Sequence, residues 1–162
     1  YGLTKGQVSP TSRIELKAYT TPYGGVEEPL NPIKYMLAYG ASFVAQAYAG
    51  KPAMCADLIQ QALEHRGFSF VNILSNCPTY NNIDTPQYYK ELVKEVPESH
   101  DVKSIDAATH LVNQYLEEGN EPVGLIHKVT RPTLCDQMSR LVKELDGGPD
   151  YDLRKIVDLN KP

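Results

Sequence analysis

The spacing of apolar residues between positions 41 and 74 predicts a strand, a helix and a second strand in succession. Residues 41–48 contain the stretch SFVAQAY, which alternates in the way expected of a β-strand. Residues 51–67 repeat apolar side chains at helical spacing and end at Gly67, a common helix stop. Residues 68–74, FSFVNIL, are mostly apolar, like a buried strand. A strand–helix–strand unit is nearly always parallel and right-handed, so we expect a parallel sheet.

Further elements flank this unit on both sides. Asn31 is a candidate N-cap, because Pro32 follows it at what would be the first helical position. Residues 1–32 are rich in turn formers, so we expect a loop with a short helix around 13–17. The other expected elements are helices at 32–39, 85–96, 105–119 and 133–145, and a third strand at 122–129. The sequence therefore predicts an α/β fold, with a parallel sheet and flanking helices in residues 1–140 and a polar tail or arm at 141–162.

Composition narrows the class of protein. A chain of 162 residues is long enough for one domain with a hydrophobic core. Its net charge is −4 and it has no basic run, so nucleic acid is not expected as a main ligand. No apolar run approaches the ~20 residues of a membrane span, and no signal-like segment is seen, so no membrane partner is expected. Three scattered cysteines argue against a disulfide framework and for a cytoplasmic protein.

Two loops carry the residues best suited to chemistry. Residues 1–12, YGLTKGQVSPTS, combine glycines, hydroxyls and Lys5, which could cradle an anion and hold a carboxylate. On composition alone, a mobile polar terminus is the more common interpretation of such a stretch. Residues 75–86, SNCPTYNNIDTP, leave the carboxyl end of the second strand, the edge where open parallel sheets bind ligands. Within them Cys77 is either structural or a ligand, and an iron–sulfur cluster needs about four such thiolates.

The other reactive residue types are expected to be structural. The sequence contains no complete catalytic motif and no Cys or His pair at metal-ligand spacing. His65 and His110 fall in predicted helices, where we expect them on solvated faces. Cys55 and Cys135 also fall in predicted helices, where a cysteine is usually a small buried apolar residue.

Five stretches of the sequence point together to a known family. They are YGLTKGQVSPTS at 1–12, TTPYG at 20–24, NP at 31–32, HRGFSFVNILSNCPTYN at 65–81 and PVGLIHKVTRPT at 122–133. In this order they resemble the β subunit of 2-oxoacid:ferredoxin oxidoreductases, and more narrowly its 2-oxoglutarate branch. The resemblance spans essentially residues 1–135. It implies a thiamine diphosphate-binding fold, of which residues 1–140 form the C-terminal part.

The resemblance implies roles for the opening loop. Tyr1, Gly2 and Thr4 match positions that lie against the cofactor's diphosphate. Leu3 and Lys5 match the substrate pocket, where the lysine faces the distal end of the 2-oxoacid. A dicarboxylate such as 2-oxoglutarate presents a second carboxylate to that cation, whereas pyruvate presents only a methyl group. An unpaired buried cation is costly, so the larger acid is the expected substrate.

The resemblance also implies metal cofactors. Cys77 matches the fourth thiolate of a [4Fe–4S] cluster, although Asn76 stands where the family commonly has proline. In the family, the other three cluster cysteines and the ligands of thiamine diphosphate and Mg²⁺ lie upstream. This sequence starts one residue after the last of those metal ligands. We therefore expect it to be the C-terminal part of such a subunit, with most cofactor ligands elsewhere.

The implied activity is the coenzyme A-dependent oxidative decarboxylation of 2-oxoglutarate to succinyl-CoA. Electrons would pass through the cluster to ferredoxin, and an α subunit would complete a hetero-oligomeric enzyme. Three alternatives stay open at this point. The chain could belong to a pyruvate:ferredoxin oxidoreductase, to a non-catalytic docking or structural α/β domain, or to a thiamine-dependent enzyme without iron.

Overall fold

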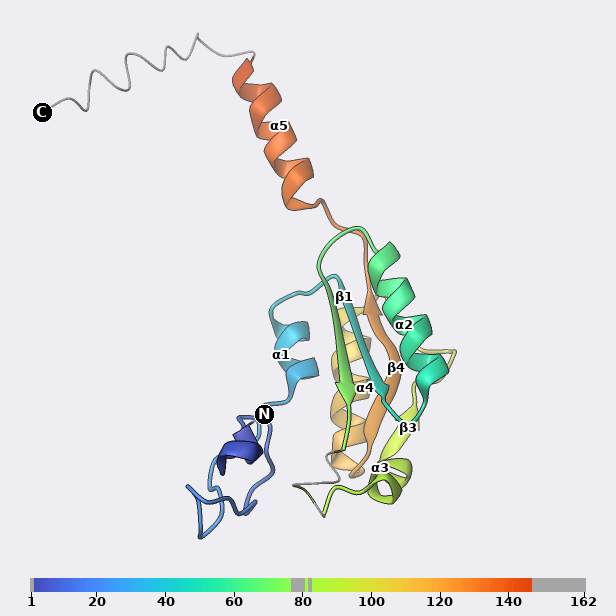
Figure 1. Cartoon of the computed structure of the whole chain (residues 1–162). Coiled ribbons are helices and arrows are strands. Elements are labelled where there is room, and N and C mark those ends of the chain that lie inside the picture. The colour runs from blue at the N-terminus through green and yellow to red at the C-terminus, as the bar shows by residue number, and fades with distance from the viewer. Residues whose placement is uncertain (1, 77–80, 82, 147–162) are drawn as a thin grey trace, which may run out of the picture. The chain divides into compact units, whose positions relative to one another are not determined.

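The central sheet has four strands in the order β2–β1–β4–β3 (Figure 1). The computed structural model describes residues 2–76, 81 and 83–146. Two parallel units, one of β1 and β2 and one of β3 and β4, meet where β1 and β4 run antiparallel. The α/β fold with flanking helices is confirmed, but the sheet is mixed rather than wholly parallel. Its strands are β1 (Phe43–Tyr48), β2 (Ser69–Leu74), β3 (Val93–Glu95) and β4 (Glu121–Lys128).

The predicted strand–helix–strand unit is confirmed as β1, α2 (Pro52–Glu64) and β2. Pro52 opens α2, where its missing N–H is no loss because the first turn has no internal acceptor for it. The strands are in register from Phe43 opposite Ser69 to Tyr48 opposite Leu74. Both strands therefore end at the same edge of the sheet, which we call the carboxyl edge.

Apolar side chains cover both faces of β1, which is buried along its whole length. On one face, Phe43, Ala45 and Ala47 pack with Leu58 of α2. On the other face, Val44 packs with α1 (Pro32–Ala38) and α4 (Ile105–Glu117). Because β1 is central, the alternation of its side chains places neighbouring residues in different layers of the core.

The structure differs from the sequence-based expectation in three short segments. The helix expected at 85–96 ends early, as α3 (Pro86–Leu92), and the chain continues as β3. Val93 is buried beside β4, so strand pairing outweighs helix propensity there. No helix forms at 13–17, because Glu15 has a φ of 65° and its N–H donates to the Gly25 carbonyl. A 3₁₀ helix that was not expected, η1, covers Gly2–Lys5.

The start of α1 provides a test of its predicted cap. The side chain of Asn31 accepts a hydrogen bond from the N–H of Lys34 at 3.0 Å, as expected for an N-cap. We expect Asn31→Ala to lower the free energy of unfolding by about 1 kcal/mol, while Asn31→Asp keeps the acceptor and most of the stability. Urea unfolding of the three proteins measures the difference. Equal stability of the Ala and Asp variants would contradict the capping role.

The chain divides into two compact units, Tyr1–Thr130 and Arg131–Pro162. In the second unit the structure describes the helix α5 (Leu134–Asp146). Within its own unit α5 leaves an apolar stripe exposed, formed by Leu134, Met138, Leu141 and Val142. Cys135 is exposed as well, so the expectation that it is a buried apolar residue was wrong. The domain boundary near residue 140 stays a prediction.

Candidate functional site

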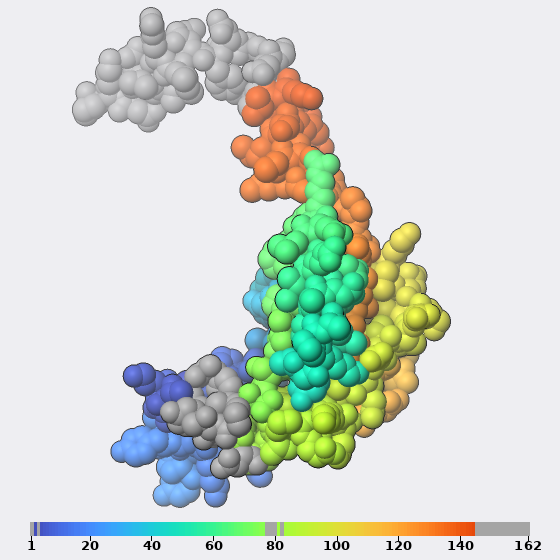
Figure 2. Space-filling view, turned by 45° about the vertical axis from the view of Figure 1, so that its right-hand side comes forward, coloured from blue at the N-terminus to red at the C-terminus, as the bar shows by residue number. Residues whose placement is uncertain are grey.

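A pocket of about 560 Å³ opens at the carboxyl edge, in the first unit. Its lining includes residues of the N-terminal segment and the start of α1, the loop that follows β2, two tyrosines of α3, and side chains of β1, β2 and β4. Figure 1 shows the N-terminal segment (blue) and α3 at the end of the sheet where β1 and β2 finish. In Figure 2 the blue N-terminal atoms and the yellow-green atoms of α3 lie at the same, lower end of the first unit. The two loops that the sequence singled out therefore meet at one pocket. The sequence had indicated the ligand-binding side for both loops, although only the second directly follows a strand.

The hydroxyls of Ser9, Thr11 and Ser12 are engaged within the first loop. The Ser9 N–H donates to the Ser12 hydroxyl at 2.9 Å, and the Thr11 N–H donates to the Ser9 hydroxyl at 3.1 Å. The Leu30 N–H donates to the Pro10 carbonyl at 2.8 Å. These bonds give the loop a fixed turn on the pocket wall, whereas the sequence suggested hydroxyls available to an anion.

The pocket floor is a polar network that sequence reasoning missed. Asn72 of β2 donates from its side-chain amide to Gln46 of β1 at 2.7 Å. Gln46 in turn donates at 2.9 Å to the Glu121 carboxylate and at 2.9 Å to the Pro122 carbonyl of β4. Gln46 is 1% exposed, yet both its side-chain NH2 group and its side-chain oxygen take part in these hydrogen bonds. A polar residue in the middle of an apolar strand, as in FVAQAY and FVNIL, is the signal that could have located this network.

Burial raises the pKa of the Glu121 carboxyl, and the hydrogen bond from Gln46 offsets part of that effect. The folded protein therefore holds this proton at pH values where the unfolded chain, with an ordinary pKa of 4.5, has lost it. The free energy of unfolding falls as pH rises from the ordinary pKa through the raised one. The contribution of the protonated Glu121 is present below that window and lost above it.

Glu121→Gln should remove this pH dependence, because an amide does not titrate. We expect its free energy of unfolding, relative to that of the unmodified protein, to increase between about pH 4 and pH 8. Urea unfolding across that range measures it, with the exposed Glu98→Gln as the matched control. Parallel pH profiles for the unmodified protein and Glu121→Gln would contradict the raised pKa.

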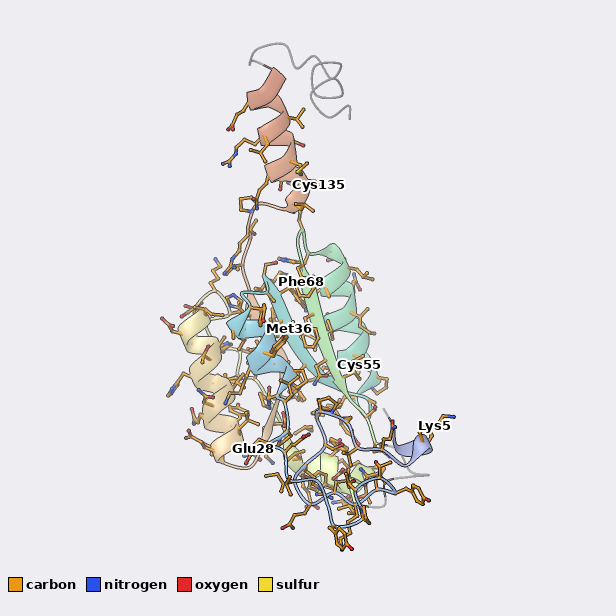
Figure 3. All side chains as sticks on the ribbon, turned by 90° about the vertical axis from the view of Figure 1, so that its left-hand side faces the viewer. Lys5, Glu28, Met36, Cys55, Phe68 and Cys135 are labelled. Carbon is orange, nitrogen blue, oxygen red and sulfur yellow. The ribbon has the colours of Figure 1, made fainter. Side chains whose placement is uncertain are left out.

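Those residues assigned to cofactor and substrate binding that the structure describes lie on η1, outside the pocket lining. Gly2, Thr4 and Lys5 belong to η1, and the side chains of Thr4 and Lys5 are exposed. Figure 3 shows Lys5 pointing outward, away from the sheet. The side chain of Leu3, and the whole of Tyr1 and Cys77, lie outside the described residues. The roles of all these residues stay predictions.

The glycines of the first loop have a structural reason to be there. A Cβ on Gly2 would lie 2.8 Å from the Cβ of Gln7. Gly6 has a φ of +70°, and a Cβ there would lie 2.5 Å from the Cβ of Tyr19. Such distances leave no room for a side chain, so both glycines let the N-terminal segment fold against itself.

Three further expectations concern His65, Cys55 and His110. His65 was expected on a solvated face, but it is half-buried. Its Nε2 and the Ser42 hydroxyl are hydrogen-bonded at 3.0 Å. Its ring lies 5.5 Å from that of Phe43, measured between centroids. Cys55 is half-buried on α2 and donates its thiol to the Tyr48 carbonyl at 3.2 Å. His110 is exposed, as predicted.

The described residues fit the expected cofactors unequally. The exposed Thr4 hydroxyl can donate to a phosphate oxygen, so η1 fits contact with a diphosphate. Among residues 2–76, 81 and 83–146, no group of three or more His, Cys, Asp or Glu side chains could hold a metal ion. That part of the chain therefore contains no donor set for Mg²⁺ or for an iron–sulfur cluster. Within the same residues, no helix has the length and apolarity needed to cross a membrane.

Two protein-family models match the chain, one in each half. Residues 1–73 match the C-terminal TPP-binding domain of thiamine pyrophosphate enzymes. Residues 77–143 match the C-terminal region of the β subunit of pyruvate ferredoxin oxidoreductase. The two matched regions meet close to the end of β2, at the carboxyl edge that borders the pocket.

Individual relatives agree with these matches. The 2-oxoglutarate synthase subunit KorB of Methanothermobacter marburgensis is 36% identical over 93% of this chain and 52% of the relative. The 2-oxoacid:ferredoxin oxidoreductase subunit beta of Saccharolobus solfataricus is 30% identical over 94% of this chain and 54% of the relative. The chain thus spans about half the length of the curated relatives it matches.

A solved structure resembles the chain in both sequence and fold. It is the 2-oxoglutarate:ferredoxin oxidoreductase from Magnetococcus marinus, with 2-oxoglutarate, coenzyme A and succinyl-CoA bound. The two are 53% identical with a TM-score of 0.87, covering 100% of this chain and 55% of the other. The chain therefore belongs to the β-subunit family of the 2-oxoacid:ferredoxin oxidoreductases, where it corresponds to the C-terminal part with its thiamine diphosphate-binding fold.

Proposed function

We propose that this chain works in the coenzyme A-dependent oxidative decarboxylation of 2-oxoglutarate to succinyl-CoA, as part of a β subunit. Its 53% identity with an enzyme whose structure holds 2-oxoglutarate, coenzyme A and succinyl-CoA is the observation that carries the proposal. The meeting of the two family-like loops at one pocket supports it. In this reaction carbon dioxide leaves the 2-oxoacid, coenzyme A takes the acyl group, and two electrons pass to ferredoxin.

Lys5 is proposed to select the substrate. It is an exposed cation on η1, so it is free to meet a ligand that arrives at this face. The distal carboxylate of 2-oxoglutarate accepts a charge-assisted hydrogen bond from an ammonium group, whereas the methyl group of pyruvate cannot. Leu3 is proposed to line the same subsite beside Lys5.

Thiamine diphosphate is the proposed cofactor. When bound, it supplies the electron sink that allows a 2-oxoacid to lose carbon dioxide. The contribution of this chain is contact and orientation: Tyr1, Gly2 and Thr4 are proposed to lie against the diphosphate, with the Thr4 hydroxyl donating to it. Mg²⁺ is proposed to bind together with thiamine diphosphate, through ligands other than Tyr1, Gly2 and Thr4.

Cys77 is proposed to supply one thiolate of a [4Fe–4S] cluster. Asn76, its neighbour in the sequence, lines the pocket, as do residues of the N-terminal segment. An α subunit and ferredoxin are the proposed partners in a cytoplasmic hetero-oligomer. The β-subunit names of the relatives support that assembly.

Substrate-dependent reduction of ferredoxin by the assembled enzyme tests the proposal. With coenzyme A present, we expect turnover with 2-oxoglutarate to exceed turnover with pyruvate, and succinyl-CoA to form in step with reduced ferredoxin. Preference for pyruvate would instead assign the pyruvate branch. Absence of turnover with every 2-oxoacid, in a preparation that retains its α subunit and cofactors, would favour the non-catalytic alternative.

A further inference from the structure

The N-terminal segment, residues 2–31, is held together by hydrogen bonds of its own backbone. The Gln7 N–H donates to the Gly2 carbonyl, and the Thr20 N–H to the Gly6 carbonyl, both at 2.9 Å. The Leu30 N–H donates to the Pro10 carbonyl at 2.8 Å and closes the segment just before α1. The segment is therefore shaped largely by itself. Its place on the carboxyl edge must be set by contacts that it makes with the rest of the first unit.

Arg13 provides such a contact. Its Nη2 lies 3.3 Å from an oxygen of the Asp84 carboxylate, in the loop that follows β2. The two side chains are 39% and 19% exposed, so the carboxylate is the better shielded partner. Both residues line the pocket. The ion pair thus joins the two loops across the site that they share.

Hydrogen bonds that do not involve Arg13 also hold Asp84 in place. The Asn81 side-chain amide donates to the second oxygen of the Asp84 carboxylate. The side-chain oxygen of Asn81, Oδ1, accepts hydrogen bonds from the N–H groups of Ile83 and Asp84, each at 3.0 Å. Asn81 is itself 6% exposed, which ties this turn to the body of the unit. An acceptor held in this way costs little to order when the pair forms.

We propose that the Arg13–Asp84 ion pair is a positioning contact, which holds the N-terminal segment, with η1 and Lys5, in place at the carboxyl edge. Its consequence for catalysis rests on the proposed function, because Lys5 is the group proposed to meet the substrate. The ion pair does not itself touch the substrate. When it is lost, the segment keeps its internal turns but separates from the loop after β2 more often.

Hydrogen–deuterium exchange of the assembled enzyme tests the positioning claim without any assay of activity. A partly exposed ion pair is weak, so we expect Arg13→Gln and Asp84→Asn each to speed exchange of residues 2–20 by about two- to fivefold. The double variant should exchange no faster than the faster single one, because both changes remove the same contact. Arg13→Lys keeps the charge and should restore most of the protection.

Two matched controls remove a charge without touching the pair. Lys17→Gln takes an exposed cation from the same segment, and Glu98→Gln takes an exposed carboxylate from the body. Both should exchange like the unmodified protein. Unchanged exchange in Arg13→Gln and Asp84→Asn, or losses of protection that add in the double variant, would overturn the proposal.

Kinetics then show whether the position of the segment matters to the reaction. We expect KM for 2-oxoglutarate to rise in the same order as the exchange rates, with a smaller change in kcat. If exchange responds but KM does not, the link from segment position to substrate is wrong. If the unmodified enzyme fails to turn over 2-oxoglutarate, the proposed function fails, and exchange still decides whether the ion pair positions the segment.

Discussion

Lys5→Ala is expected to lower kcat/KM for 2-oxoglutarate by about 10- to 100-fold. A hydrogen bond to a charged group contributes about 1.5–3 kcal/mol, and each 1.36 kcal/mol corresponds to tenfold in rate. Pyruvate carries no distal carboxylate, so its kcat/KM should change little. Steady-state kinetics of the assembled enzyme with both acids measures the ratio of the two effects.

Two variants control for changes unrelated to the distal carboxylate. Lys5→Arg retains a cation and should recover part of the activity with 2-oxoglutarate. Lys94→Ala removes an exposed cation from β3 and should alter neither substrate. Equal losses of kcat/KM for 2-oxoglutarate and pyruvate in Lys5→Ala would contradict the substrate-selecting role of Lys5.

Cys77→Ser is expected to have the second large effect. A hydroxyl is a much poorer ligand for iron than a thiolate, and changes around metal ligands alone typically cost 10- to 100-fold in affinity or activity. Loss of a ligand should reduce 2-oxoglutarate-dependent ferredoxin reduction by more than about 100-fold. Iron content and the broad visible absorption of the cluster should fall with it.

The other two cysteines serve as matched controls. Cys55 donates its thiol to a backbone carbonyl, and Cys135 is exposed on α5. Cys55→Ser and Cys135→Ser should therefore keep the iron content and the absorption of the unmodified enzyme. A Cys77→Ser enzyme with a full complement of iron would show that this thiol is not a ligand.

Local rules in the sequence predicted much of the fold. The alternation in β1, the apolar spacing of α2 and the cap at Asn31 each depend on neighbours within a few residues. Thr85 caps α3 in the same way, accepting from the Tyr88 N–H at 3.2 Å. Such features are visible in a single sequence because the interactions that produce them are local.

Features that depend on distant residues were missed. Val93 leaves the expected helix because β4, almost thirty positions further on, offers it a strand partner. Gln46 and Glu121 are 75 positions apart, and their hydrogen bond follows from β1 and β4 lying side by side. Arg13 and Asp84 meet for the same kind of reason, since the chain must fold before the two loops share an edge. Local chemistry singled out the opening loop as a candidate, whereas the roles expected of its residues came from the family resemblance.

The central claim is that this chain presents Lys5 to the distal carboxylate of 2-oxoglutarate in a β subunit of the family. A structure of the assembled enzyme with 2-oxoglutarate bound tests it most directly. We expect the Lys5 ammonium to lie about 2.7–2.9 Å from an oxygen of that carboxylate, the range of a charge-assisted hydrogen bond. A bound 2-oxoglutarate whose distal carboxylate pairs with another cation, while Lys5 faces solvent, would contradict the claim.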